Sequence, residues 1–171
     1  LSGPLWRKRT SLAFSLDGTS AFDTQTIVAA TTDGPVRTSV ERPNDLASVS
    51  VRLEHSLSSS QQLRVEWQRI HKATSNLGVG NFDLESRAYG QTSNESVLRT
   101  SLTGSLGKFR YNEARLSLRS RDLSSRSAVH AQTLTVMNAF TSGGAQVDGS
   151  RETTEFELAD DLDVSKGRHA F

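Results

Sequence analysis

The sequence contains no cysteine and has no marked excess of charge of either sign. The absence of cysteine excludes a disulfide framework and thiolate chemistry. It says little about the cell compartment, because many exported bacterial chains also lack this residue. The 20 basic and 19 acidic residues leave a formal charge of +1 and are interleaved along the 171-residue chain. Because no basic block stands out, no nucleic-acid partner is predicted.

Long hydrophobic runs are also missing. Stretches such as residues 27–30 hold only a few consecutive apolar residues, whereas a membrane-spanning helix needs about 20. Hydrophobic residues make up 35% of the chain, which is less than the usual share for a globular domain. An interpretation that places the chain in a membrane must therefore use strands, and the low apolar content favours a sheet with one face in water.

The clearest pattern lies in residues 47–71, where two alternating runs flank a polar segment at 58–62. In each run the apolar residues share one side of the alternation, which predicts a strand with one apolar face. The polar segment predicts a turn, so the runs form an antiparallel hairpin. The apolar positions are Val49, Val51, Leu53 and Leu57 in the first run and Leu63, Val65 and Trp67 in the second.

The apolar face of this hairpin has about the height of a membrane. A strand inclined by about 40° rises on the order of 2.5 Å per residue, so residues 49–57 span roughly 23 Å. The apolar girdle of a transmembrane β-barrel has a similar height. The apolar face therefore meets either a protein core or lipid.

The same pattern recurs twice. Residues 98–118 alternate around a tight turn at Gly107 and Lys108, and residues 156–171 alternate around a turn at 165–167. A further strand is predicted from Leu12 to Leu16, extending toward Phe22, whereas residues 1–9 are predicted as a turn or lead-in segment.

Long polar connections separate these hairpins. They are predicted at residues 22–46, which contain the breakers Asp33-Gly34-Pro35 and Arg42-Pro43-Asn44-Asp45, and at residues 72–94 and 120–151. Residues 133–140 are a candidate short strand inside the third connection. Connections of this length are uncommon in a compact soluble domain, whereas short turns alternating with long loops are typical of outer-membrane barrels.

These features predict an all-β fold, an antiparallel up-and-down meander of about seven to eight strands that forms a segment of a large transmembrane β-barrel wall. Residues 1–171 then form one partial barrel domain, without the N-terminal plug or the remainder of the barrel. The chain opens at LSGPLW and stops at Phe171 just as another strand starts, so we interpret it as a fragment of a longer protein.

The alternation assigns residues to the two faces of this wall. One residue, Asp160, falls in phase with the apolar face, and a local bulge would turn it to the other side, so the sequence leaves its orientation open. The candidate lipid-facing residues are Val51, Leu53, Val65, Trp67, Leu102, Leu116 and Leu158. The candidate lumen-facing residues are Arg52, Glu54, Arg64, Glu66, Arg99, Glu113, Arg115 and Arg119.

Several short segments, in order along almost the whole chain, resemble the TonB-dependent outer-membrane receptors of the Oar-like type, in which the barrel follows a carboxypeptidase-regulatory-like domain and a plug. The first segments are Ser2-Gly3-Pro4, Phe22-Asp23-Thr24 with residues 27–29, and residues 78–84 with Arg87-Ala88-Tyr89. The later segments are Leu106-Gly107-Lys108 with Asn112-Glu113, Ala139-Phe140-Thr141 with residues 143–146, and residues 159–163 with residues 166–169.

This resemblance implies a location in the bacterial outer membrane and a role in the uptake of a substrate that the sequence does not identify. The implied partners are outer-membrane lipid, the remainder of the chain's own barrel and plug, and the TonB system, which contacts a segment outside this chain. No cofactor is implied, and no residue of the chain is assigned to energy coupling.

The sequence offers no catalytic or metal-binding constellation, so no enzymatic activity is predicted. The four histidines, at positions 55, 71, 130 and 169, are far apart, and a metal site needs three or four converging ligands. Gly78 and Gly80 lack the third glycine of a dinucleotide-binding loop. No G-x-S-x-G nucleophile elbow occurs.

Two alternatives stay open. A soluble β-sandwich binding module or adhesin, which binds a glycan or a protein, would bury the same apolar positions between two sheets. A small self-closed porin of about eight strands is less consistent with the strand that starts at the end of the sequence.

Overall fold

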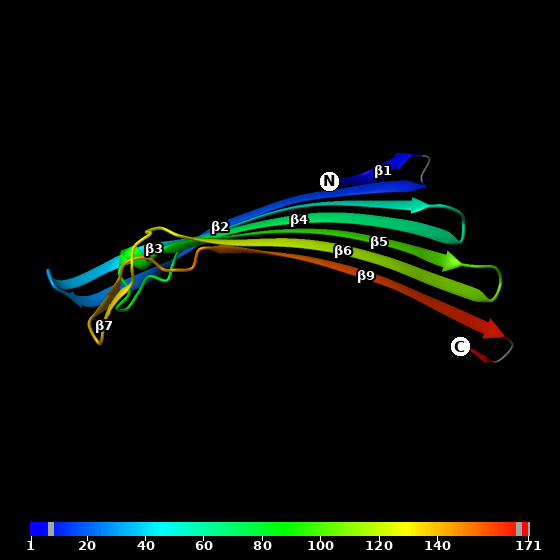
Figure 1. Cartoon of the computed structure of the whole chain (residues 1–171). Coiled ribbons are helices and arrows are strands. Elements are labelled where there is room, and N and C mark those ends of the chain that lie inside the picture. Colours follow the sequence, from blue (N-terminus) through cyan, green and yellow to red (C-terminus); the bar gives the residue numbers. More distant parts are fainter. Residues whose placement is uncertain (7–8, 167–168, 171) are drawn as a thin grey trace.

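The computed structural model describes residues 1–6, 9–166 and 169–170. Its main element is one antiparallel sheet with eight strands in the order β1-β2-β3-β4-β5-β6-β9-β10, and a small separate sheet pairs β7 with β8 (Figure 1). Neighbours in the main sheet follow each other along the chain except where β7 and β8 intervene. The predicted all-β, up-and-down meander of seven to eight strands is therefore confirmed.

The strands differ greatly in length. The long strands are β2 (Thr10–Thr31), β3 (Gly34–Ser56), β4 (Gln61–Leu77), β5 (Tyr89–Ser105), β6 (Arg110–Ser127) and β9 (Gly149–Lys166). The short ones are β1 (Ser2–Trp6), β7 (Leu134–Val136), β8 (Phe140–Ser142) and β10 (His169–Ala170), and a single 3-10 turn, η1, covers Glu85–Arg87.

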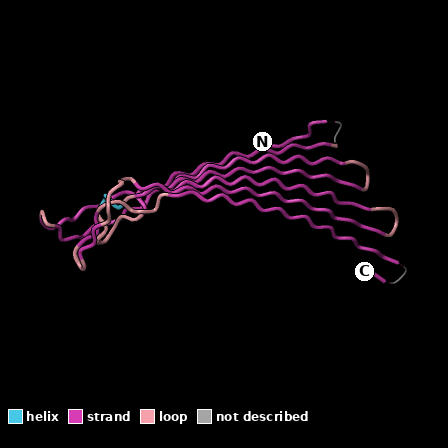
Figure 2. Tube along the Cα trace, viewed as in Figure 1, coloured by secondary structure: helices cyan, strands magenta, loops and turns pink. Residues whose placement is uncertain are grey.

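The β3–β4 and β5–β6 turns lie at one end of the sheet. The two long connections lie at the other end, as does the two-residue turn at residues 32–33 between β2 and β3 (Figure 2). Residues 57–60 join β3 to β4 and residues 106–109 join β5 to β6, so these two of the three predicted hairpins are confirmed. At the opposite end, residues 78–88 join β4 to β5 and residues 128–148 join β6 to β9. The turn predicted through Gly167 and the strand predicted to start at Phe171 involve residues outside the described ranges. Arg7, Lys8 and Arg168 also lie outside these ranges.

The predicted polar connection at residues 22–46 is wrong. Strands β2 and β3 run through it as one long hairpin, in unbroken register from the pair Thr10–His55 to the pair Thr31–Gly34. Pairing of β3 with β4 ends at Asn44, so the prolines at positions 35 and 43 lie where β3 is an edge strand. A proline can occupy an edge strand because its missing N–H leaves no ladder bond unmade there.

Three smaller predictions also need correction. Residues 2–6 form a strand, β1, paired with β2, instead of a turn or lead-in segment. The second and third connections are shorter than predicted, because the strands on both sides extend into them. Residues 133–140 do not form one strand; β7 and β8 form a small hairpin whose first pair is Leu134–Ser142.

The sheet is open. In the order of paired strands, β1 and β10 lie at opposite edges, and β10 pairs with β9 only at Ser165 and Lys166. Most of the outer edge of β9 therefore has no strand beside it among the described residues. The barrel-wall interpretation of this sheet is taken up below as a proposal.

Candidate functional site

The strand register brings the candidate lipid-facing residues onto one face of the sheet, because directly paired residues of an antiparallel ladder share a face. Two complete rows cross six strands. The first row is Phe14, Val51, Trp67, Leu98, Leu118 and Phe156, and the second is Leu12, Leu53, Val65, Thr100, Leu116 and Leu158. Leu102 lies in the adjacent row, where it pairs with Leu63 and Ala114.

This apolar face is not covered by any described segment. None of the seven candidate lipid-facing residues is buried. At the β9 side of the face, the exposed fractions of Phe156 and Leu158 reach 65% and 69%. An uncovered apolar surface across six strands far exceeds the scattered apolar residues of an ordinary protein surface, and such surfaces mark sites of contact with lipid or protein.

Asp160 lies on this apolar face. Strands β6 and β9 pair without a register shift from Arg110–Val164 to Ser125–Gly149, so the bulge that would have turned Asp160 to the other face does not occur. Asp160 pairs with Ala114, and the Nδ2 atom of Asn112 donates a hydrogen bond of 2.9 Å to its Oδ1 atom. The carboxylate is thus satisfied by an amide from the neighbouring strand.

All eight candidate lumen-facing residues lie on the opposite face. Opposite charges alternate across the strands, since Arg52 pairs directly with Glu66 and Glu66 with Arg99. The Glu66 carboxylate accepts contacts from three guanidinium groups, those of Arg52 at 3.2 Å, Arg64 at 3.1 Å and Arg99 at 3.8 Å. Arg64 also approaches Glu54 at 3.9 Å.

Two further groups of ion pairs continue the pattern toward β9. Arg115 contacts Glu113 at 3.7 Å and also pairs with Asp161. Arg119 lies 3.7 Å from Glu95 and 3.5 Å from Glu155. The eight residues therefore share one polar face but fall into three separate ion-pair groups, around Glu66, Arg115 and Arg119, instead of a single cluster.

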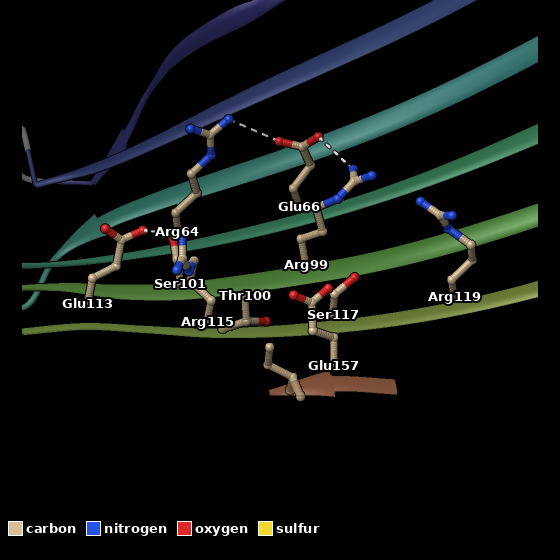
Figure 3. A pocket seen from close by; sticks show the side chains of 11 residues that line it. Arg64, Glu66, Arg99, Thr100, Ser101, Glu113, Arg115, Ser117, Arg119 and Glu157 are labelled. Carbon is tan, nitrogen blue, oxygen red and sulfur yellow. Dashed lines mark hydrogen bonds and ion pairs between the residues drawn. The ribbon is translucent and has the colours of Figure 1, made fainter. Parts of the chain in front are cut away.

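An open depression of about 460 Å³ lies on this polar face over β4, β5 and β6 (Figure 3). Arg64, Glu66, Arg99, Arg115 and Glu157 are among the side chains that line it. Because most of these groups are substantially exposed, each ion pair contributes about 0–1 kcal/mol to stability. The face is suited to contact with water and with polar solutes.

The two long connections fold over the polar face at the end of the sheet opposite the β3–β4 and β5–β6 turns. We call these connections, together with the outer part of the β2–β3 hairpin, the cap. Its core consists of Ile27, Ala29, Val79, Ala88 and Phe140, with Val36, Val40, Leu84 and Ala139 packed around it. Ile27 is 1% exposed. By strand parity, Ile27 and Ala29 are on the same face as Arg52 and Glu54.

Backbone hydrogen bonds tie the two long connections to the edge of β2 within the cap. Val28 donates to the carbonyl of Asn81 at 2.7 Å, and Asn81 donates to Thr26 at 2.8 Å. Ala30 donates to Ala139 at 3.2 Å. The two connections are also bound to each other, because Thr141 donates to Phe82 at 2.8 Å and Leu84 donates to Thr141 at 2.9 Å.

Side chains add to this network. The Nη1 atom of Arg87 donates to Thr133 Oγ1 at 2.9 Å and to the carbonyl of Gly144. Outside the sheet, Asp148 Oδ1 accepts a hydrogen bond of 2.8 Å from the backbone N–H of Ser127. This bond is the main reason that the pKa of the Asp148 carboxyl lies below its ordinary value, with smaller contributions from His130 and Arg126.

Sequence reasoning did not find the cap. The sequence features that indicate the cap are the short apolar run at residues 27–30 and the spacing of Val36 and Val40. Together they place apolar side chains on the face that is charged elsewhere in the sheet. The breakers in residues 22–46 predict a connection there, and that prediction hides the alternation across them.

Among the residues that the structure describes, no group of three or more His, Asp or Glu side chains is arranged to hold a metal ion. No helix within the described ranges has the length and hydropathy of a membrane span. Comparisons with protein-family models, curated proteins and solved structures found no match to this chain.

Proposed function

We propose that this chain is part of the barrel wall of a TonB-dependent outer-membrane receptor of the Oar-like type, which takes up a substrate that remains to be identified. The observation that carries the proposal is the uncovered apolar face across six strands, backed by a charged face. A transmembrane β-barrel has this division, with apolar residues toward lipid and polar residues toward the lumen. The TonB-dependent class itself rests on the ordered sequence segments described above.

The position of the apolar band supports an inclined wall. On β2 its members are Leu12, Phe14 and Leu16, whereas on β9 they are Phe156, Leu158, Leu162 and Val164. Along a row of paired residues from β2 to β9, the centre of the apolar band shifts by about four residues toward the end of the sheet that carries the β3–β4 and β5–β6 turns. This shift is about 13 Å over a sheet width of about 24 Å. The band is thus inclined by about 30° to the rows, near the strand inclination of membrane barrels.

The sheet edges support continuation of the wall. Among the described residues, the outer edge of β9 has a strand beside it only at Ser165 and Lys166, and lipid offers the backbone groups of the remaining edge no hydrogen-bond partner. In this proposal, further strands of the same barrel pair with that edge, and the polar face meets the plug and the aqueous lumen. The β3–β4 and β5–β6 turns lie on the periplasmic side and the cap on the extracellular side.

The alternative of a soluble β-sandwich module or adhesin requires a second layer over the two apolar rows. No described segment provides that layer, because the connections fold over the opposite face. If washing of membranes releases the protein expressed from its gene as a soluble monomer, this alternative is favoured.

A cysteine scan tests the proposal directly, because every cysteine introduced into this chain is the only one in it. Four variants along β4, Arg64→Cys, Val65→Cys, Glu66→Cys and Trp67→Cys, are labelled in outer membranes with a water-soluble maleimide. We expect labelling at positions 64 and 66 and protection at 65 and 67. Equal labelling at all four positions in membranes, with full labelling after denaturation in detergent, would contradict a lipid-facing row.

A further inference from the structure

A further depression lies on the polar face over β5, β6 and β9, and its volume is about 300 Å³. It lies beyond the row of Leu118 and Phe156, on the side toward residues 128–148. Three arginines line it, Arg119, Arg121 and Arg151, together with Thr153, Glu95 and Glu155. In the proposed barrel this depression faces the lumen near its extracellular mouth.

Arg121 and Arg151 differ from the other strand arginines of the polar face, because neither contacts a carboxylate of any described residue. Each of the others forms an ion pair with at least one carboxylate. These others are Arg42, Arg52, Arg64, Arg99, Arg115 and Arg119. Arg121 and Arg151 are also exposed, so a solute can reach both guanidinium groups.

The strand register brings these two arginines together. Arg121 on β6 is directly opposite Thr153 on β9, and Arg151 precedes Thr153 by two residues on the same face. Arg121 and Arg151 are therefore diagonal neighbours across the two strands, separated by about 7–8 Å of backbone. Because arginine side chains span this distance, one oxyanion between them is within reach of both guanidinium groups and of the Thr153 hydroxyl.

The charges around the depression favour an anion. Its two carboxylates, those of Glu95 and Glu155, both contact Arg119, at 3.7 Å and 3.5 Å. One positive charge is in excess, since three arginines face two glutamates. A guanidinium binds carboxylate and phosphate groups through two parallel N–H donors. The two remaining arginines are therefore complementary to an oxyanion.

We propose that this depression binds an anionic solute through a carboxylate or phosphate group, which lies between Arg121 and Arg151 and accepts a further hydrogen bond from Thr153. The substrate class of the proposed receptor is then a solute that carries such a group. This inference rests on the proposed function, because the polar face must line a lumen that the solute enters. A carboxylate from another part of the same protein is the competing occupant, and the test distinguishes it.

Isothermal titration calorimetry of the full gene product in a non-ionic detergent tests the site with citrate and inorganic phosphate as probes and glucose as the uncharged control. We expect both anions to bind more tightly than glucose. Arg121→Gln and Arg151→Gln should each weaken the binding of both anions about tenfold. Arg121→Lys keeps the charge but not the two parallel donors, so it should retain part of the binding.

The matched control is Arg69→Gln. Arg69 is also an exposed strand arginine without an ion pair to any described residue. It lies in the row next to that of Trp67 and has the same strand parity, so it lies on the opposite face. Its substitution should leave anion binding unchanged.

Three results would overturn the site: glucose binding equal to that of the anions, unchanged anion binding in Arg121→Gln or Arg151→Gln, or an equal loss in Arg69→Gln. Absence of anion binding to the unaltered protein would also do so, because it would indicate that a carboxylate of the protein itself occupies the two arginines. A carbonate wash of membranes separates these failures from failure of the proposed function. A protein that stays in the membrane but binds anions independently of Arg121 and Arg151 lacks only the site. A protein that washes off refutes the proposed function and, with it, the role of the site in uptake.

Discussion

Asn112 and Asp160 form a polar pair inside the apolar face, joined by a hydrogen bond of 2.9 Å from the Asn112 amide to the Asp160 carboxylate. If this face meets lipid, the carboxylate opposes membrane insertion, although less than a basic residue would. We expect Asp160→Leu to raise the free energy of unfolding in detergent micelles by about 1 kcal/mol. This is a net value, because the gain from removing the carboxylate is reduced by the loss of one hydrogen bond. Urea titration followed by tryptophan fluorescence measures this change.

The matched control for that variant is Asp161→Leu, one residue away on the polar face, where Asp161 pairs with Arg115. Losing an exposed ion pair should lower stability by no more than about 1 kcal/mol. The two substitutions should therefore have opposite signs. A destabilisation by Asp160→Leu equal to that by Asp161→Leu would argue that the apolar face is not in lipid.

Ile27 is the most deeply buried side chain of the cap, and its truncation should open the cap without unfolding the sheet. We expect Ile27→Ala to cost about 2–4 kcal/mol locally, and hydrogen exchange should accelerate at the amides of Val28, Asn81 and Leu84, whose bonds tie the cap together. Val28→Ala is the control, because Val28 is 51% exposed and faces away from the cap core. Unchanged exchange at Asn81 in Ile27→Ala would show that the connections are held by other contacts.

The sequence predicted the sheet well where each strand has one apolar and one charged face. Strict alternation around residues 47–71 correctly gave the faces of Val51, Glu66 and Trp67, because a one-residue slip of register would exchange the two faces. The outer part of the β2–β3 hairpin was missed because its prolines lie at a free edge, where they do not interrupt the ladder. The cap was missed because it depends on contacts between segments far apart in sequence, such as Ile27 with Phe140, which local periodicity does not report.

Gly104 sits where the backbone of β5 passes close to β4, and its φ of +152° lies in a region that favours glycine. A Cβ atom at this position would lie 2.1 Å from the carbonyl oxygen of Ser60 and 2.7 Å from Cα of Gln61. Gly104→Ala should therefore destabilise the β4–β5 pairing by at least about 2 kcal/mol, measured by urea titration. Gly149→Ala is the control, since nothing lies within 4 Å of its added Cβ; equal unfolding midpoints for the two variants would contradict the close approach.

Asp148 couples the third connection to pH. The Ser127 N–H that bonds its carboxylate lowers the pKa of Asp148 below the ordinary 3.8. A carboxyl whose pKa is lower in the folded state stabilises that state fully above the unfolded pKa, and this stabilisation is lost as the pH falls through the folded pKa. We therefore expect residues 127–148 to lose hydrogen-exchange protection, corrected for intrinsic rates, only below about pH 4. Asp148→Asn keeps an acceptor for Ser127 but has no charge to titrate, so its protection should be weaker and should not change between pH 6 and pH 3; a variant that follows the wild-type profile would assign the transition to another group.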